Sequence, residues 1–205
     1  MFCACGAEEE NTATEKSTES EATTEPVLEE EKVTIAENSY NIEEAVVGIF
    51  EIGKVVPDPL PEGLKIRQFI ETSTDEHGKT VEYTHNVIFN QLEDVVELIM
   101  EKNQEINHTD KAIEEMMVLS NYYETPEGIT VGKTIEEFKE TYPDMSVWYD
   151  KANKCYLLET EKVPGAQFIF SDLDIAKRAK GSGEHQRLDA TYIRKGAKIE
   201  KIRVH

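Results

Sequence analysis

The feature that most restricts the fold of this chain is its N-terminal segment, where almost nothing can enter a hydrophobic core. From Gly6 to about Ala36 the sequence is almost entirely Glu, Thr, Ser and Ala. Over residues 1–45, thirteen glutamates stand against only Lys16 and Lys32. Such a segment buries too little apolar surface to offset the entropy of ordering it. We therefore predict a disordered acidic stalk over residues 1–39 and folded structure beyond it.

The charge of the whole chain restricts its partners. The 205 residues carry a formal net charge of −20 at pH 7. Because a polyphosphate would be repelled by that field, we expect no nucleic acid among the partners. No apolar run is long enough to cross a bilayer.

Beyond residue 40, short apolar segments alternate with turn sequences, which favours antiparallel strands. Two segments have the composition of hairpin turns, residues 75–78 and 150–153. Segment 92–102 fits a helical stripe as well as a strand, and we assign it to a strand because the tandem arrangement described below needs one there. We interpret Gly181-Ser182-Gly183 as part of a flexible loop between the last two strands, with a phosphate-binding loop as the alternative. The predicted strands cover residues 64–73, 80–91, 95–101, 113–120, 145–150, 154–161, 166–171 and 198–205.

One helix has an explicit start and end. Thr134-Ile135-Glu136-Glu137 is a capping box, in which the threonine hydroxyl and the glutamate carboxylate each satisfy an amide of the first turn. Ile135 and Phe138 then share one helix face, and Tyr142-Pro143 ends the helix because a residue before proline disfavours helical backbone.

The first half of the folded part has a similar order of features. Gly53-Lys54 corresponds to Gly132-Lys133, although Val55 stands where Thr134 stands and prolines follow it. The predicted fold class is therefore α+β, with two tandem repeats over residues 40–125 and 126–205. Each repeat is expected to be a short helical segment followed by a four-stranded antiparallel sheet.

The stretch from Gly128 to Phe138, followed by Tyr142-Pro143, resembles the opening of the β-lactamase-inhibitor-protein-like (BLIP-like) fold. It is also similar to the small lipoproteins of the outer-membrane barrel-assembly machine. The resemblance covers residues 126–205 and, more weakly, residues 40–123. It implies two units whose sheets lie side by side as one surface that grips a protein. No functional residue of these families has a counterpart here beyond the motif.

The extreme N-terminus resembles the end of a bacterial lipoprotein signal. Ala4 is the small residue and Cys5 the cysteine that is lipidated in that family, and the acidic run Glu8-Glu9-Glu10 resembles the export signal of some surface lipoproteins. The match does not extend to the charged and hydrophobic segments that precede the cysteine in the family. It implies a lipid anchor at Cys5 in the outer membrane of a bacterial cell envelope, where the protein could also face the cell surface.

The residues predict neither a catalytic site, a metal site nor a cofactor. The five histidines are not spaced with other ligands, and nothing near Cys3 and Cys5 completes a metal-binding set. No phosphate loop, dinucleotide fingerprint or nucleophile elbow is present.

Strand alternation indicates which side chains could meet a partner. If Leu64 and Ile66 face inward, Arg67 and Phe69 face outward; inward Leu157 likewise puts Tyr156 outward. Aromatic and arginine side chains on a sheet face are typical of protein interfaces. The predicted partner-binding residues are Arg67, Phe69, Trp148, Tyr156, Lys201 and Arg203.

The C-terminal segment from Lys177 onward is locally basic in this acidic chain. It can be interpreted as a solvated, lysine-protected edge strand or as a patch for an acidic partner or anionic surface.

We expect a cell-envelope lipoprotein acting as a non-catalytic module that binds another envelope protein. The alternatives are a periplasmic or surface enzyme on a cationic substrate, and a structural spacer.

Overall fold

The computed structural model describes residues 41–74, 77–100, 111–151, 153–174 and 185–205. Strands predominate among these residues, and the described chain has one α-helix and two short 3-10 helices. In chain order the elements are β1 (Ile42–Glu43), β2 (Val46–Val47), β3 (Phe50–Glu51), β4 (Lys65–Thr74), β5 (Thr80–Phe89), β6 (Asp94–Met100), β7 (Ile113–Val118), α1 (Ile135–Thr141), β8 (Ser146–Asp150), β9 (Cys155–Glu159), β10 (Ala166–Ser171), η2 (Asp172–Asp174), β11 (His185–Leu188), η3 (Ala190–Tyr192) and β12 (Lys201–Val204).

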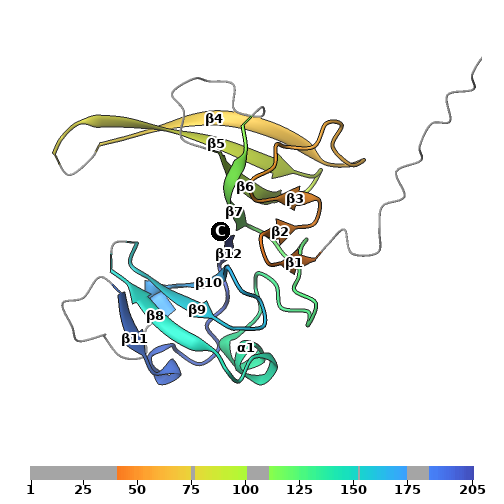
Figure 1. Cartoon of the computed structure of the whole chain (residues 1–205). Coiled ribbons are helices and arrows are strands. Elements are labelled where there is room, and N and C mark those ends of the chain that lie inside the picture. Colours follow the sequence, from red (N-terminus) through yellow and green to blue (C-terminus); the bar gives the residue numbers. More distant parts are fainter. Residues whose placement is uncertain (1–40, 75–76, 101–110, 152, 175–184) are drawn as a thin grey trace, which may run out of the picture. The chain divides into compact units, whose positions relative to one another are not determined.

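The strands from β4 to β12 form one continuous antiparallel sheet of nine strands (Figure 1). Their spatial order is β11-β8-β9-β10-β12-β7-β6-β5-β4. The last strand of the chain, β12, lies between β10 and β7, so that Ile202 faces Phe168 on one side and Val118 on the other. The C-terminal strand therefore joins the two halves of the chain by backbone hydrogen bonds.

One row of apolar side chains crosses all nine strands on the same face of the sheet, the core face. Each member is the cross-strand partner of the next, and all belong to one hydrophobic core or pack against it. Such a row fixes the register, because a slip of one residue would turn a strand's apolar side chains to the opposite face. From β11 to β4 the row is Leu188, Val147, Leu158, Phe168, Ile202, Val118, Val96, Ile88 and Ile66.

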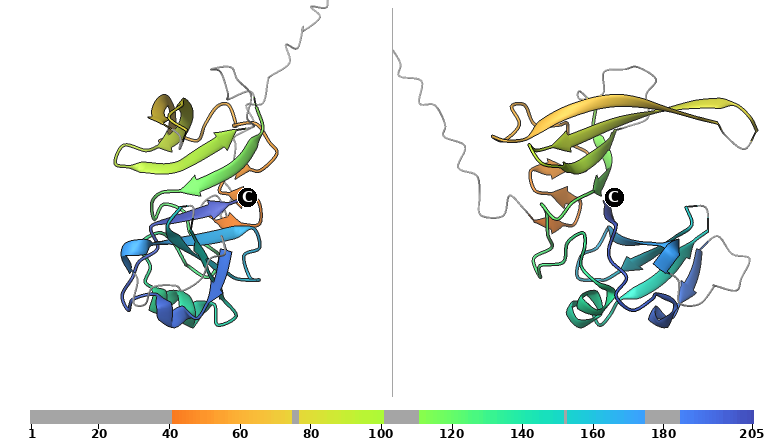
Figure 2. Two further views of the ribbon diagram at one scale, coloured as in Figure 1. Left: turned by 90° about the vertical axis from the view of Figure 1, so that its left-hand side faces the viewer. Right: turned by 180° about the vertical axis from the view of Figure 1, so that it is seen from behind.

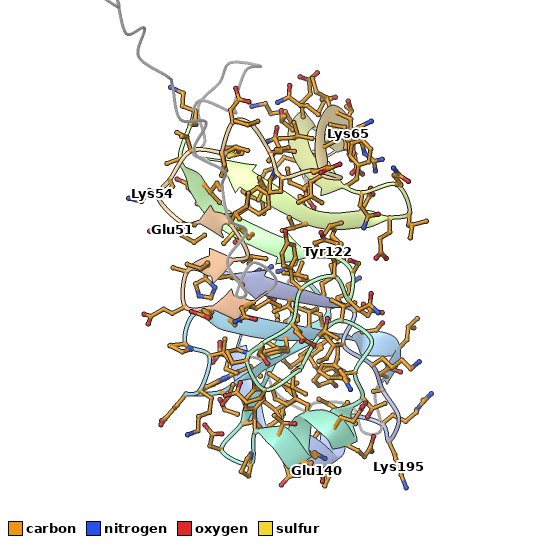
Figure 3. The ribbon with its side chains drawn as sticks, turned by 90° about the vertical axis from the view of Figure 1, so that its right-hand side faces the viewer. Glu51, Lys54, Lys65, Tyr122, Glu140 and Lys195 are labelled. Atoms are coloured by element: carbon orange, nitrogen blue, oxygen red, sulfur yellow. The ribbon has the colours of Figure 1, made fainter. Side chains whose placement is uncertain are left out.

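Two elements supply the side chains that close this core. The first is a small sheet of the two-residue strands β1, β2 and β3, and the second is α1. Figure 3 looks onto this side of the sheet, with both elements toward the viewer. Their buried side chains in the core are Ile42, Val47, Phe50, Ile135 and Phe138.

The capping box at the start of α1 is confirmed. The Thr134 hydroxyl accepts a hydrogen bond from the Glu137 amide at 3.3 Å, and the Glu137 carboxylate accepts one from the Thr134 amide at 2.8 Å. The Lys133 ammonium lies 2.9 Å from the same carboxylate. The Thr134 amide first, and then Lys133 and the Thr134 hydroxyl, lower the pKa of Glu137 to about 2. The helix ends at Thr141, before Tyr142-Pro143 as predicted.

The predicted fold of two tandem α+β repeats was wrong. The sheets of the two halves are one sheet, and the described part of the first half contains no helix. Val55 offers no capping oxygen and the following prolines block helical hydrogen bonds, so the segment that should have been helical is irregular. The core of this half is closed instead by β1–β3, whose tight turns use positive φ at Ala45 and Gly48.

Most predicted strands are confirmed individually, including the strand predicted in segment 92–102, where β6 covers Asp94–Met100. Tandem repeats do not account for β6, since the two halves share one sheet. The strand is favoured instead by burial of Val95, Val96 and Leu98 in a central position of the sheet. Four strands were missed: the short strands β1, β2 and β3, and β11, which pairs with β8 in a region interpreted from the sequence as a loop. Residues 181–183 lie outside the described residues.

Candidate binding face

The face of the sheet opposite the core, called the outer face below, carries a second set of aligned side chains. One row runs from β10 to β4, and a shorter row runs from β8 to β12. Figure 2 shows the sheet from two further directions, its left panel from the side of β4 and β5 away from β1–β3. The long row is Gln167, Arg203, Met117, Glu97, Val87 and Arg67, and the short row is Trp148, Leu157, Ile169 and Lys201.

Three apolar side chains form the floor of the outer face. Val87 and Leu157 are each 3% exposed and Ile169 is 8% exposed. They are the described buried hydrophobic residues that do not belong to the hydrophobic core. Other parts of the chain than the core therefore cover them, and Met117 on the same face is itself half-buried. The outer face is amphipathic, with an apolar base and a polar, aromatic upper layer.

Arg67 and two aromatic rings organise the first-half end of the outer face. The Arg67 guanidinium lies 2.5 Å from the Asp94 carboxylate and stands 5.9 Å from the ring centre of Phe69 and 5.4 Å from that of Phe89. Phe69 stacks on the imidazole of His85 at 4.8 Å and remains 43% exposed. Rigid, partly exposed aromatic surface of this kind is suited to contact with a protein.

Acidic side chains at this end of the face lie beside basic ones. The two ring nitrogens of His85 lie 2.5 Å from Glu97 and 3.3 Å from Glu71. At the centre, the Arg203 Nε lies 3.2 Å from Glu115. Each outer-face carboxylate named here has a basic side chain beside it.

A chain of polar contacts runs from the centre toward β8. The Arg203 Nη1 donates to the Gln167 Oε1 at 3.3 Å, and the Gln167 Nε2 donates to the Glu159 Oε1 at 2.7 Å. Lys201 is exposed beside this chain.

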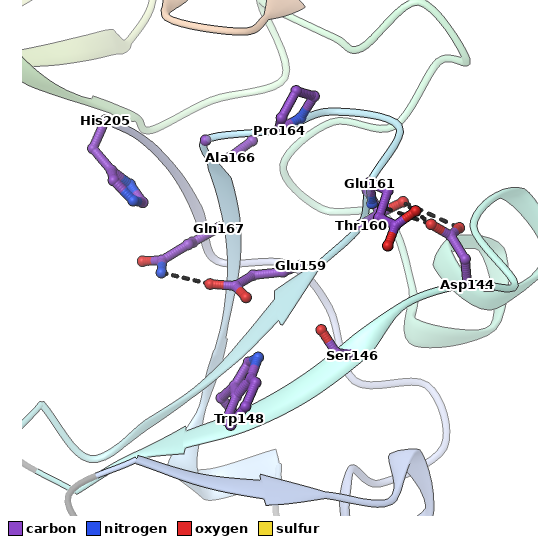
Figure 4. Close-up of a pocket in the computed structure, with 11 residues that line it drawn as sticks. Asp144, Ser146, Trp148, Glu159, Thr160, Glu161, Pro164, Ala166, Gln167 and His205 are labelled. Atoms are coloured by element: carbon purple, nitrogen blue, oxygen red, sulfur yellow. Dashed lines mark hydrogen bonds between the residues drawn. The ribbon is translucent and has the colours of Figure 1, made fainter.

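A pocket of about 510 Å³ opens at the second-half end of the outer face. Its walls come from β8, β9, β10 and the connection that follows β9 (Figure 4). Its polar and aromatic lining includes Asp144, Ser146, Trp148, Glu159, Glu161, Gln167 and His205.

Hydrogen bonds hold the carboxylate of Asp144 at the rim of the pocket. It accepts from the Thr160 hydroxyl at 3.0 and 3.1 Å and from the Glu161 amide at 3.1 Å. Desolvation, the largest single contribution, raises the pKa of Asp144, but the Thr160 and Glu161 hydrogen bonds and the charge of Lys162 bring it below its usual value. Asp144 is therefore a fixed negative charge at neutral pH.

The structure brings five of the six predicted partner-binding residues to the outer face. Arg67, Phe69, Trp148, Lys201 and Arg203 all lie there. The outward orientation predicted for the sixth, Tyr156, was wrong, because Tyr156 is fully buried in the hydrophobic core while Leu157 points to the outer face.

The cause of that error is local. All three residues 156–158 are apolar and buried, so alternation gave no signal to choose between the two registers of β9. Sequence reasoning also missed His85, Glu97, Glu159 and Gln167 as neighbours of the predicted residues, because their proximity depends on cross-strand register. Cys5 lies outside the described residues.

The shifted pKa values elsewhere have structural causes. Burial raises the pKa of Tyr142 well above its usual value, while its hydroxyl lies 2.7 Å from the Thr125 hydroxyl and donates to Glu127 at 2.8 Å. Glu137 belongs to the helix cap. Among the described residues, no group of three or more His, Cys, Asp or Glu is arranged to hold a metal ion, and no helix is long and apolar enough to span a membrane.

No protein-family model, no curated protein and no solved structure matches this chain.

Proposed function

We propose that this chain is a non-catalytic module that binds another protein of the bacterial cell envelope through the outer face of its sheet. The observation that carries the proposal is the composition of that face. Aromatic, methionine and arginine side chains, the types enriched at protein interfaces, lie together over an apolar floor that is separate from the core.

The rigidity of the face supports the proposal. Phe69 is fixed by stacking on His85, and Arg67 and Arg203 are fixed by carboxylates of neighbouring strands. A binding surface that is already ordered loses little side-chain entropy when a partner docks. Exposed Phe69, with well-packed neighbours, is the side chain we expect to contribute most to affinity.

The location of the module is part of the same proposal. The resemblance of Ala4-Cys5 to a lipoprotein processing site supports a lipid anchor at Cys5 in the outer membrane, with the acidic N-terminal segment between anchor and folded part. Metabolic labelling with a palmitate analogue, in the cells that make the protein, should modify the wild-type chain and Cys3→Ala but not Cys5→Ala. Equal labelling of Cys5→Ala, or no labelling of any of the three chains, would contradict lipid attachment at Cys5.

Affinity capture tests the binding function. The full chain, its Phe69→Asp variant and its Leu92→Asp variant serve as baits in detergent-solubilised envelope. Leu92 is the matched control, because it is an apolar side chain 93% exposed in the turn between β5 and β6. We expect one identified protein to be retained by wild type and Leu92→Asp and lost with Phe69→Asp. Thermal unfolding checks that both variants fold. Equal retention by all three baits, or nothing specific on any, contradicts the proposal.

A further inference from the structure

The walls of the pocket at the second-half end of the outer face differ in charge from the rest of that face. Among the described residues, its lining contains three carboxylates, from Asp144, Glu159 and Glu161, the imidazole of His205, and no lysine or arginine. Elsewhere on the face the carboxylates that border Arg67 and Arg203 are paired with those side chains. The described lining therefore carries more acidic than basic side chains, with Lys162 close enough to Asp144 to lower the pKa of that carboxyl.

Glu159 is the carboxylate best placed to meet a ligand. The contact that holds it is with a neutral group, since its Oε1 accepts from the side-chain amide of Gln167. That bond orients the carboxylate without neutralising its charge. Its second oxygen, Oε2, has no hydrogen-bond partner among the described residues.

An aromatic wall stands beside this carboxylate. Trp148 is the cross-strand partner of Leu157, so Glu159 is its diagonal neighbour on the same face of β9. Diagonal neighbours in antiparallel strands lie within reach of large side chains. In Figure 4 the indole of Trp148 and the carboxylate of Glu159 project from neighbouring strands into the same space.

We propose that this pocket binds an arginine side chain of the protein that docks on the outer face. A guanidinium is planar, so it can stack against the indole of Trp148 while its fork of N–H groups donates to Glu159. Asp144 and Glu161 at the rim add long-range attraction for the same cation. A lysine ammonium would gain the charge interactions but lacks the planar, bidentate geometry. This inference rests on the proposed function, since the arginine is taken to belong to the docked partner.

The chain carries its own probe for the test, because Trp148 is its one tryptophan. The indole N–H signal of the full chain is followed by NMR during titration with acetyl-Gly-Arg-Gly-amide. The same peptide with citrulline, which keeps the shape and removes the charge, is the matched ligand control, and a lysine peptide tests the planar geometry. We expect a saturable shift with arginine, weaker binding with lysine and no saturation with citrulline.

Two charge-removing variants locate the effect. Glu159→Gln should weaken binding of the arginine peptide at least tenfold, whereas Glu140→Gln, an exposed carboxylate on α1, should leave it unchanged. Thermal unfolding confirms that both variants are folded. The proposal is overturned if arginine and citrulline peptides behave alike, or if Glu159→Gln binds the arginine peptide as wild type does.

The test separates this inference from the proposed function. Absence of arginine-peptide binding together with Phe69-dependent capture of a partner would remove the pocket proposal and leave the docking face intact. If the arginine peptide binds but the Phe69→Asp variant captures the partner as well as wild type does, the outer face is not the docking surface. The arginine would then not be assigned to a docked protein.

Discussion

The two halves of the nine-stranded sheet share one core row but are covered by different elements. In the second half, Thr134 starts a capped helix that packs over the sheet; in the first half, Val55 and the prolines after it leave only the small sheet β1–β3 to do so. The difference teaches that local capping chemistry determined the covering elements, whereas the cross-strand apolar row determined the sheet.

The outer faces of the two halves also differ. The first-half end presents stacked rings and carboxylates beside Arg67 and His85, and the second-half end presents a pocket with three carboxylates beside Trp148. If one partner spans the face, its two contact regions should differ in chemistry: apolar against Phe69, cationic against Glu159.

The largest effect on stability is expected from a substitution inside the core that the two halves share. Phe168 is fully buried and its ring lies 4.7 Å from that of Phe138 on α1. Phe168→Ala should lower the free energy of unfolding by about 3–5 kcal/mol, because it removes buried apolar surface and leaves a cavity. Urea unfolding measures the change, with Leu173→Ala, at an 80% exposed position, as a control expected near zero.

The same experiment asks whether the halves unfold together. Trp148 fluorescence reports the second half, and far-UV circular dichroism reports all strands. Because one core contains side chains of both halves, we expect the two transitions to coincide in wild type. Two separated transitions would show that the continuous sheet is not one cooperative unit.

A smaller effect is expected at the helix cap. Thr134→Ala should cost about 1 kcal/mol of stability, as loss of an N-cap oxygen usually does. Thr134→Ser should retain most of it. The reciprocal change, Val55→Thr, should add no helical circular dichroism because Pro57 and Pro59 follow directly. A gain of helix there would mean that capping alone distinguishes the halves.

The cap also predicts a pH dependence specific to the second half. Glu137 has a folded-state pKa of about 2, below the value of an unfolded glutamate, so the folded state binds its proton less readily. Its contribution to stability is therefore complete above the unfolded pKa and is lost as the pH falls toward 2. Glu137→Gln should flatten the decline in urea midpoint between pH 5 and pH 2, and Glu140→Gln should not. An unchanged decline in Glu137→Gln would remove the cap as its cause.

The smallest effect on stability is expected on the first-half outer face. The Arg67–Asp94 pair is largely exposed, with 48% and 38% of the side chains accessible. Arg67→Ala should change the free energy of unfolding by less than about 0.5 kcal/mol, since exposed pairs contribute little. A much larger loss of stability in the same urea assay would show that the main role of Arg67 is to stabilise the fold and not to bind a partner.

Much of the sheet could be predicted from the sequence, since strand length, turn residues and apolar alternation are local signals. The capping box of Thr134 and Glu137 was equally local and was predicted correctly. The joining of the halves was not predictable in this way, because it depends on β12 returning between β10 and β7, a contact between segments far apart in the chain. The predicted repeat fails at Val55, which has no side-chain oxygen to cap a helix.

The candidate site was predicted in part for the same reason. Alternation placed Arg67, Phe69 and Arg203 on the outer face, but it failed at Tyr156, within a run of buried apolar residues. The pairing of Phe69 with His85 and of Glu159 with Gln167 depends on register between strands, which periodicity within one strand does not give.

The measurement that tests the central claim most directly is oxidative footprinting of the chain with and without its captured partner. Met117 and Trp148 lie on the outer face, whereas Tyr122 packs against the hydrophobic core. If the outer face is the docking surface, the partner should reduce labelling of Met117 and Trp148 and leave Tyr122 unchanged. Unchanged labelling of Met117 and Trp148 in the complex, or protection of Tyr122 alone, would contradict the account.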